Sequence, residues 1–383
     1  MNFELGEEHL MVRSIVSKFA AEELVPVADR MDREDYFPSD IFRKLGDMGM
    51  LGITIPTESG GSGLDYISQM ICLEEIARVS PAFALSVGAH SNLCLDNLYR
   101  NGSRWIREEY VPKLAAGKWI GCLALTEPES GSDALAMKTS ASKNGDSYII
   151  SGSKTFITNA PEADMALVYA KTDPAAGRKG ISAFVVEASS KGYRRGKKFD
   201  KMGMRGSPTG ELFFDACEVP SSALVGTENH GASIVMSGLS VERAVLAGIS
   251  LGIQEQCMDL ASSYARERKQ FGVTLSKFEL IQEKIASMYV GIEASRLLIY
   301  RALQIMQRDR SRNREAAAAI LFAAETSTRT ALDAIQVMGG YGYMREFAVE
   351  KLMRDAKLLE IGAGTSEIRK LIIARELLGD GAK

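Results

Sequence analysis

The sequence predicts an α+β protein built from three consecutive parts: an N-terminal helical domain (residues 1–118), a middle antiparallel β-domain (119–228) and a C-terminal four-helix bundle (229–383). Apolar residues first recur at three- and four-residue spacing, as in amphipathic helices. Segments rich in β-branched and aromatic residues then follow one another between about 120 and 225. After Gly231 the chain returns to long helical patterns. A length of 383 residues suits two to three domains.

The first part contains clear helix and loop signals. Ser80-Pro81 is typical of a helix start, with Ser as the N-cap and Pro at the first helical position, and it predicts a helix over Ala82–Leu98. The run Glu58–Gly63 carries no apolar face and predicts a loop. The helical spacing is carried by Phe19, Leu24, Ile41, Leu45 and Met48.

The middle part predicts strands without helices of useful length between them. Asn144-Gly145 is a strong signal for a β-hairpin. The predicted strands are Tyr148–Ile150, Thr155–Thr158, Met165–Ala170, Ile181–Val186 and Leu212–Phe214.

The last part predicts about four antiparallel helices joined by short loops. Glycine clusters interrupt the pattern at Gly339–Gly342 and at Gly362–Gly364. Ser276 and Glu279 have the spacing of a capping box, which predicts that a helix opens at this point.

Composition excludes several classes of function. Forty-six Lys and Arg residues against 49 Asp and Glu residues leave no basic excess for binding nucleic acid. No apolar run approaches the ~18 residues of a membrane span. The first residues resemble neither a secretory signal nor a transit peptide, so we expect a cytoplasmic protein.

Neither a metal centre nor a nucleotide fold of the common types is predicted. The five cysteines include no CxxC pair, and none of the three histidines has another histidine three or four residues away. We therefore expect no metal. The chain also lacks GxGxxG and GxxxxGK[ST], so any demanding chemistry is expected to depend on a cofactor held in another way.

Three polar loops are candidates for ligand binding. Leu123–Asp133 follows a predicted strand and could offer backbone N–H groups to ligand oxygens, although a surface turn explains it equally. Phe156 and Thr158 share one face of a strand and could line a flat ring or simply pack in the core. Glu360–Glu367 either approaches a ligand closely through its glycines or is a helix start capped by Thr365 or Ser366.

Glu242 is the carboxylate that the pattern singles out. Val245, Leu246 and Ile249 lie three, four and seven residues further on, so Glu242 heads an apolar stripe that should face inward. A carboxylate there would have a raised pKa and would be costly unless used or paired. The alternative is a position at the stripe's edge or a pair with a nearby Arg. His90 is expected to satisfy a turn or core hydrogen bond, and Arg205 to be either a solvated loop cation or a residue folded over a ligand.

Several motifs, in order along the whole chain, resemble the acyl-CoA dehydrogenase family. They are Thr126–Asp133, Arg266–Gly272, Gln336–Gly342, Met353–Lys357 and Glu360–Arg369. The resemblance implies the same three-part fold, a homotetramer and one FAD in each subunit.

The resemblance also implies cofactor contacts. One subunit would hold the flavin ring and ribityl chain through Leu123, Leu125, Thr126, Gly131, Ser132, Phe156 and Thr158, with Thr365 and Glu367 completing the site. A neighbouring subunit would contact the adenosine pyrophosphate through Arg268, Gln336, Gly339 and Gly340. Phe156 stands where many members have Trp. Glu279 stands where members commonly have Gln, which leaves its contact with the cofactor open.

The position of the catalytic base is the informative departure. Many members carry a catalytic Glu where this chain has Ala363, whereas the isovaleryl-CoA dehydrogenase branch carries it at the position of Glu242. The resemblance therefore implies that Glu242 removes an α-proton, while the Ala363 backbone N–H donates to the thioester oxygen. Substrate contacts would come from Ser132, Leu93, Leu239, Arg243 and Gly364.

The predicted activity is FAD-dependent α,β-dehydrogenation of a short branched-chain acyl-CoA to the 2-enoyl-CoA, with electrons passed to an electron-transferring flavoprotein. One alternative is a straight short-chain, 2-methyl or alicyclic acyl-CoA, because Leu93, Leu95 and Ala247 are of small to medium size. Two others are a flavin-binding assembly protein without activity and an oxidase that passes electrons to oxygen.

Overall fold

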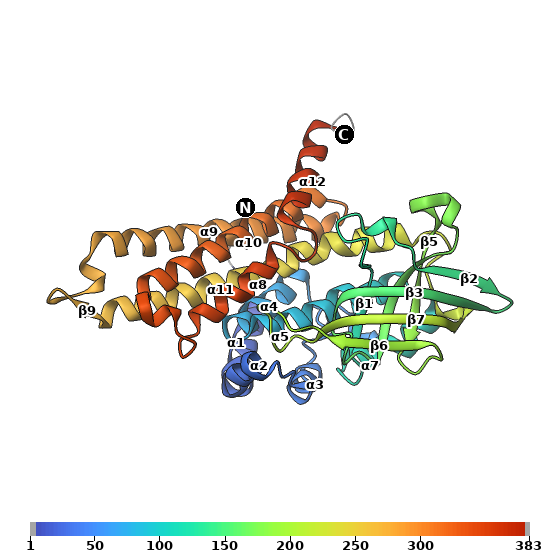
Figure 1. Ribbon diagram of the computed structural model, residues 1–383, viewed down its shortest axis with the longest axis horizontal. Helices are drawn as coiled ribbons and strands as arrows, with labels where there is room; N and C mark the ends of the chain where they lie inside the picture. The colour runs from blue at the N-terminus through green and yellow to red at the C-terminus, as the bar shows by residue number, and fades with distance from the viewer. Residues whose placement is uncertain (1–4, 380–383) are drawn as a thin grey trace.

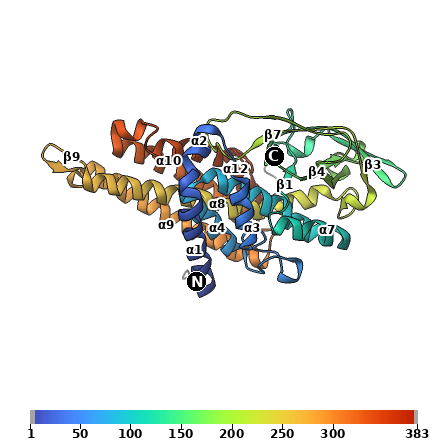
Figure 2. The same cartoon turned by 90° about the horizontal axis from the view of Figure 1, so that it is seen from below.

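The computed structural model describes residues 5–379 and shows the three parts in the predicted order (Figure 1). The N-terminal part is helical, as predicted, and Ser80 caps the Pro81 helix by accepting from the Phe83 backbone N–H at 3.3 Å. Its α-helices are α1 (Glu7–Phe19), α2 (Ala28–Glu34), α3 (Ser39–Asp47), α4 (Tyr66–Val79), α5 (Pro81–Gly88), α6 (Asn97–Asn101) and α7 (Arg104–Ala115). A π-helical segment, η4 (Ala89–Asp96), joins α5 to α6 without a break in the chain direction. Figure 2 shows α1 and α3 in the middle of the view, between the end near β9 and the β-domain.

The middle part is a single sheet of eight strands that is mostly antiparallel. The prediction of an antiparallel domain needs a correction, because β4 pairs in parallel with β1 over four residues and with β2 at Ser140. β1 enters directly from the helical domain and joins the sheet beside β4 rather than as part of a hairpin. The strands are β1 (Gly121–Ala124), β2 (Ser140–Asn144), β3 (Ser147–Thr158), β4 (Met165–Lys171), β5 (Ile181–Glu187), β6 (Tyr193–Lys198), β7 (Thr209–Pro220) and β8 (Leu224–Val225).

The predicted hairpin is confirmed between β2 and β3. Asn144 pairs with Ser147, and Gly145 in the turn has φ of 58°, a conformation that glycine adopts at little cost. The two predicted strands Tyr148–Ile150 and Thr155–Thr158 are one strand, β3, with irregular pairing to β7 at two places. The second irregularity lies between Lys154 and Ile157 and reorients the residues between them.

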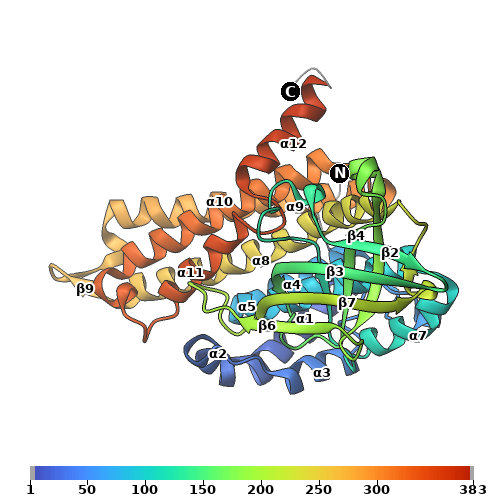
Figure 3. The same cartoon turned by 45° about the vertical axis from the view of Figure 1, so that its right-hand side comes forward.

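The C-terminal part is a bundle of long helices from which the last helix projects (Figures 1 and 3). The helices are α8 (Gly231–Glu267), α9 (Glu279–Arg308), α10 (Asn313–Met338), α11 (Val349–Leu359) and α12 (Ser366–Leu378), with the short strands β9 (Lys269–Gln270) and β10 (Val273–Thr274) between α8 and α9. A helix opens at Ser276–Glu279, as predicted, but without the capping box. The turn Leu275–Lys277 delays the helix, Glu279 becomes its first residue, and Phe278 caps it without a side-chain hydrogen bond.

Helix α8 is the core of the molecule, because it packs against α4 as well as against α9 and α10. By length and hydropathy α8 is apolar enough to cross a membrane, whereas the sequence predicted no apolar run of that length. However, 83% of its most apolar 18-residue window is buried inside the protein, so packing in the bundle accounts for its hydropathy.

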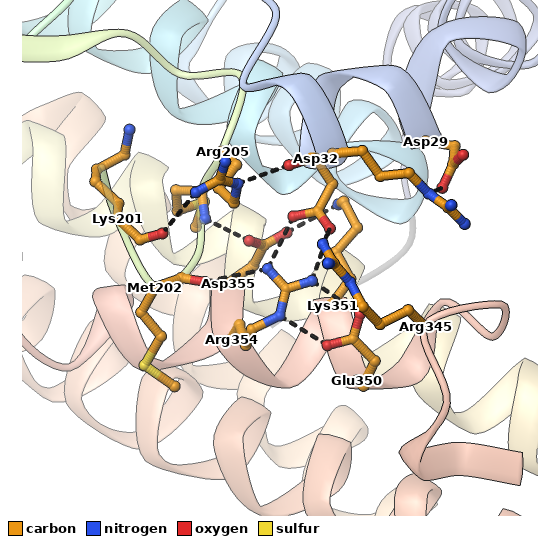
Figure 4. Close-up of polar contacts among 12 residues, drawn as sticks. Asp29, Asp32, Lys201, Met202, Arg205, Arg345, Glu350, Lys351, Arg354 and Asp355 are labelled. Atoms are coloured by element: carbon orange, nitrogen blue, oxygen red, sulfur yellow. Dashed lines mark hydrogen bonds and ion pairs between the residues drawn. The ribbon is translucent and has the colours of Figure 1, made fainter. Parts of the chain in front are cut away.

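A charged cluster joins three segments that are distant in sequence (Figure 4). Asp32 on α2 accepts from both terminal nitrogens of Arg354 on α11, at 2.8 and 2.7 Å. Arg205, in the loop before β7, donates to the Asp32 carbonyl at 2.7 Å and pairs with Asp200. Arg205 is therefore not a free surface cation, because it fixes its loop to α2.

Candidate active site

Glu242 lies on α8 with only 2% of its surface exposed. Its Oε2 atom has no hydrogen-bond partner among the described residues, and no cation there lies within ion-pair distance of either oxygen. Burial raises the pKa of Glu242 to about 8, and the Asn92 amide acts in the opposite direction. The prediction of an inward-pointing carboxylate is confirmed, whereas neither the edge position nor the Arg pair is found.

The segment opposite Glu242 is the continuous helix formed by α5 and η4. A Cβ atom added at Gly88 would lie 4.0 Å from Glu242 Oε1, and one added at Gly238 would lie 2.4 Å from Asn97 Nδ2. This antiparallel register brings Asn92 toward Glu242. Asn92 is buried and close enough to Glu242 to affect its pKa, yet neither of its amide atoms has a hydrogen bond of good geometry among the described residues.

His90 connects this helix to the β-domain. Its Nε2 bonds to the Leu114 carbonyl at 3.0 Å, and its Nδ1 accepts from the Gly121 backbone N–H at 3.0 Å. Burial lowers the pKa of His90 to about 4, which keeps the ring neutral with the proton on Nε2. The expectation of a satisfied core histidine is confirmed. Asn159, at the end of β3, adds a second link by donating to the Ser86 carbonyl at 2.9 Å.

The loop Gly362–Gly364 lies beside the same part of α8. Arg243 Nε, one residue after Glu242, donates to the Ala363 carbonyl at 3.0 Å. A Cβ atom at Gly364 would lie 3.6 Å from Arg243 Nη2. Thr365 caps α12 by accepting from the Ile368 backbone N–H at 3.3 Å, which confirms the helix-start interpretation of this stretch. The structure thus brings Arg243, the residue that follows Glu242 on α8, together with Ala363 and Gly364.

The residues expected to face the flavin ring lie where β1 and β3 come together. The Thr155 backbone N–H donates to the Thr126 carbonyl at 2.9 Å, which joins the loop after β1 to β3. Phe156 has φ of 57° and is 69% exposed, so the irregularity in β3 turns its ring out of the sheet. An exposed aromatic ring held in a strained conformation is better suited to covering a ligand than to core packing.

A buried ion pair anchors the loop that follows β1. Lys154 Nζ lies 2.8 Å from Glu127 Oε1 and 3.0 Å from the Leu125 carbonyl oxygen. Glu127 also accepts from the backbone N–H groups of Lys138 and Thr139. Burial lowers the pKa of Lys154 to about 8, although Glu127 favours its charged form. Sequence reasoning missed Lys154, since its partner Glu127 lies 27 residues away.

The residues expected to contact the adenosine pyrophosphate gather at the opposite end of the bundle. Arg268, Gln336, Gly339 and Gly340 line one cavity of about 600 Å³, together with Tyr264 and Tyr341. Cβ atoms added at Gly339 and Gly340 would meet nothing within 4 Å, so the backbone there is open to a ligand. Figure 1 shows this end, near β9, far from the β-domain. One chain therefore holds two separated halves of the expected FAD site.

The remaining predicted residues are peripheral in this structure. Gly131, Ser132, Glu367 and Glu279 are exposed. Leu93 and Leu239 are half-buried; Leu93 lies on η4 next to Asn92, and Leu239 lies one turn before Glu242 on α8. Among the described residues no group of three or more His, Cys, Asp or Glu side chains could hold a metal ion.

The chemistry of this arrangement is that of a buried base in a dry, apolar site. A buried carboxylate loses hydration, which raises its pKa, so its ionised form is a stronger base than a carboxylate in water. The open faces at Phe156, Thr126 and the glycines of the second cavity suit a planar ring and a phosphate-bearing chain, which is what FAD presents. The residues present therefore fit the cofactor.

Known proteins are similar to this chain over nearly its whole length. Models of the acyl-CoA dehydrogenase N-terminal, middle and C-terminal domains match residues 6–118, 122–217 and 229–378. The mitochondrial isovaleryl-CoA dehydrogenase of Pongo abelii is 46% identical, over 98% of this chain and 90% of its own length. The mitochondrial 2-methylacyl-CoA dehydrogenase of Solanum tuberosum is 44% identical, over 97% and 91%.

Among solved structures, butyryl-CoA dehydrogenase from Megasphaera elsdenii superposes with a TM-score of 0.97 at 35% identity, covering 99% of this chain and 100% of that one. The predicted family, fold class and cofactor are confirmed. The chain belongs to the acyl-CoA dehydrogenase family and is an FAD-dependent oxidoreductase acting on a CH–CH bond.

Proposed function

We propose that this enzyme dehydrogenates a short branched-chain acyl-CoA of the isovaleryl-CoA type to its 2-enoyl-CoA, with Glu242 as the base. The observation that carries the proposal is the buried, unpaired carboxylate of Glu242, beside a loop that has Ala363 at the alternative base position.

In this mechanism Glu242 takes the α-proton of the thioester. The α-proton is far too weakly acidic for an ordinary carboxylate, so negative charge developing on the thioester oxygen must be stabilised. The Ala363 backbone N–H would donate to that oxygen, and such a donor is worth about 3 kcal/mol. When bound, FAD supplies the acceptor for the hydride that leaves the β-carbon.

The walls around Glu242 support a compact acyl group. Leu73 and Leu246 would lie 3.4 and 3.5 Å from a Cβ atom at Gly88, on the side that faces the carboxylate. Leu95 and Ala247 are fully buried nearby in the same helices. Aliphatic side chains at this depth would limit the acyl group to a short chain and exclude water from the base. Ser132 and Arg243 would contact the CoA part, with Leu93, Leu239 and Gly364 lining the entrance.

A 2-methylacyl-CoA is the second candidate substrate, because the 2-methylacyl-CoA dehydrogenase of Solanum tuberosum is almost as similar as the isovaleryl enzyme. An anaerobic titration of the holoenzyme with isovaleryl-, 2-methylbutyryl-, butyryl- and octanoyl-CoA separates these possibilities. We expect isovaleryl-CoA to bleach the flavin absorbance at the lowest concentration. Tighter and faster bleaching by 2-methylbutyryl- or butyryl-CoA would reassign the substrate.

We also propose that the enzyme is a cytoplasmic homotetramer that passes electrons to an electron-transferring flavoprotein. The separation of the two halves of the FAD site within one chain supports assembly, since a neighbouring copy would supply Arg268, Gln336, Gly339 and Gly340. Loss of FAD on substitution of Arg268 by Ala, with an unchanged β-domain, would support this arrangement. Release of hydrogen peroxide during turnover in air would instead indicate an oxidase.

A further inference from the structure

The loop Gly362–Gly364 holds a non-glycine residue in an unfavourable conformation. Ala363 has φ of 55° and Gly364 has φ of 97°. A left-handed conformation costs an alanine roughly 1–2 kcal/mol, because its Cβ approaches the following carbonyl. Such strain persists only where surrounding contacts impose it.

Two arginines from different helices hold the carbonyl groups of this loop. Arg243 on α8 donates from Nε to the Ala363 carbonyl at 3.0 Å. Arg369, in the second turn of α12, donates from Nη2 to the Gly362 carbonyl at 2.6 Å. The two peptide groups that flank the Ala363 Cα are therefore each held by one arginine, and the one held by Arg369 carries the Ala363 N–H.

Both arginines are buried without a carboxylate partner. Arg369 is 0% exposed and Arg243 is 4% exposed, and neither guanidinium forms an ion pair among residues 5–379. Burial and then the neighbouring Arg243 lower the pKa of Arg369 to about 10, while Glu360, Glu325 and Glu367, which lie beyond ion-pair distance, act in the opposite direction. Nε and Nη1 of Arg369 and Nη1 of Arg243 have no hydrogen-bond partner among the described residues. Two buried cations that no carboxylate contacts directly are costly, and their donors are directed at the carbonyl groups of this loop instead.

We propose that Arg369 is a positioning residue for the Ala363 backbone N–H. With Arg243 it keeps Ala363 left-handed, so that this N–H points toward the thioester oxygen, and it places positive charge behind the donor. The inference rests on the function proposed above. During proton transfer to Glu242, the electron pair of the α-C–H bond moves toward the thioester oxygen, and a nearby cation lowers the energy of that charge.

Three variants of the holoenzyme test this role. Arg369→Gln removes the charge, and Arg369→Lys keeps the charge without the fork of guanidinium donors. Lys370→Gln is the matched control, because Lys370 is the next residue on α12 and forms an exposed ion pair with Glu325. Two measurements are made besides steady-state kinetics. The first is incorporation of solvent deuterium at the α-carbon of the acyl-CoA without an electron acceptor, and the second is amide hydrogen exchange of the peptide that contains Ala363 and Gly364.

We expect Arg369→Gln to lower kcat and α-carbon exchange at least tenfold while KM changes less than threefold. Amide exchange at Ala363–Gly364 should accelerate, Arg369→Lys should recover part of kcat, and Lys370→Gln should match the wild type. Wild-type α-carbon exchange or amide exchange in Arg369→Gln would overturn the proposal, as would a loss in KM alone. If Arg369→Gln does not fold, Arg369→Lys decides: unchanged kcat and amide exchange in that variant would overturn it.

These results distinguish the two levels of inference. If the wild-type enzyme neither bleaches its flavin nor exchanges the α-proton of any acyl-CoA, the proposed function fails. If the wild type does both and Arg369→Gln behaves identically, only the role of Arg369 fails.

Discussion

Two buried carboxylates in this enzyme have opposite environments. Asp32 is 5% exposed and accepts a bidentate pair of hydrogen bonds from Arg354 (Figure 4), whereas Glu242 is 2% exposed and has no cation. Burial acts to raise the pKa of Asp32, but Arg354 outweighs it and the pKa lies below its ordinary value. For Glu242 burial has the largest effect, and the pKa lies above its ordinary value.

The difference separates a carboxylate that stabilises the fold from one that is reserved for chemistry. A paired acid stays ionised and joins elements, as Asp32 joins α2 to α11. An unpaired buried acid costs free energy and is retained where a proton must be moved. The comparison can be tested by substitutions on either side.

The largest expected effect is on catalysis at the unpaired site. Glu242→Gln keeps the shape of the side chain and removes its basicity, so flavin reduction by the best acyl-CoA should slow by about 10²-fold or more. Glu108→Gln, an exposed glutamate on α7 in an i,i+4 pair with Arg104, is the control and should change nothing. Stopped-flow absorbance measures both, and a Glu242→Gln rate within threefold of the wild type would remove Glu242 from the mechanism.

At the paired site the expected effect is on stability. Arg354→Met leaves the Asp32 carboxylate buried without its main partner, and the free energy of unfolding should fall by about 3–5 kcal/mol. Adding Asp32→Leu should recover much of that loss, because the unpaired charge is then gone. Denaturant unfolding of the two variants measures this. Equal stability of Arg354→Met and the wild type would show that the pair contributes little.

Glu242 should also make the stability of the enzyme depend on pH in the unusual direction. The folded-state pKa of about 8 lies above the ordinary value near 4.5, so the folded protein binds more protons than the unfolded chain between these pH values. The free energy of unfolding of the substrate-free enzyme should therefore fall as pH rises through this window, by up to about 1.4 kcal/mol per unit from this group. Glu242→Gln should lack this contribution, so its free energy of unfolding should increase relative to that of the wild type as pH rises. Parallel stability curves for the two proteins would contradict the unpaired state of Glu242.

The smallest expected effect is the transfer of the base to the tail loop. Because Arg243 bonds the Ala363 carbonyl, position 363 lies beside the start of the Glu242 stripe. Glu242→Gly combined with Ala363→Glu should recover about tenfold in activity over Glu242→Gly alone, measured with straight-chain acyl-CoA. The recovery should be partial, since Glu at position 363 inherits the left-handed backbone. No recovery would mean that the two positions address different protons.

Periodicity was sufficient to predict most of the fold. The three parts and the strands β3, β4, β5 and β7 followed from local patterns, whereas β6, which is rich in Lys and Arg, and the two-residue β8 were not predicted. Glu242 was found because Val245, Leu246 and Ile249 share its helical face. The parallel pairing of β1 with β4 was not predictable, because strand partners depend on the path of the chain through the whole domain. The capping box failed because the preceding turn, rather than Ser276, determined where α9 begins.

The site was predicted in its residues more than in its contacts. Lys154 pairs with Glu127, 27 residues away, and Asn92 affects Glu242 on another helix. These two residues and Arg369 each lack a local signal that separates them from an ordinary polar residue. Arg369 in particular has the spacing of any residue in the second turn of a helix. Only the three-dimensional structure shows that its guanidinium donates to the Gly362 carbonyl and forms no ion pair with the described residues.

The most direct test of Glu242 as the base is the pH profile of kcat/KM for the best acyl-CoA, measured from pH 5 to pH 9 in the wild type and in Glu242→Gln. The required form of the base is the ionised one, so kcat/KM of the wild type should rise about tenfold per pH unit and level off near pH 8. kcat/KM of Glu242→Gln should be low at every pH from 5 to 9 and should not show this rise. The same limb and plateau in both proteins would contradict the account.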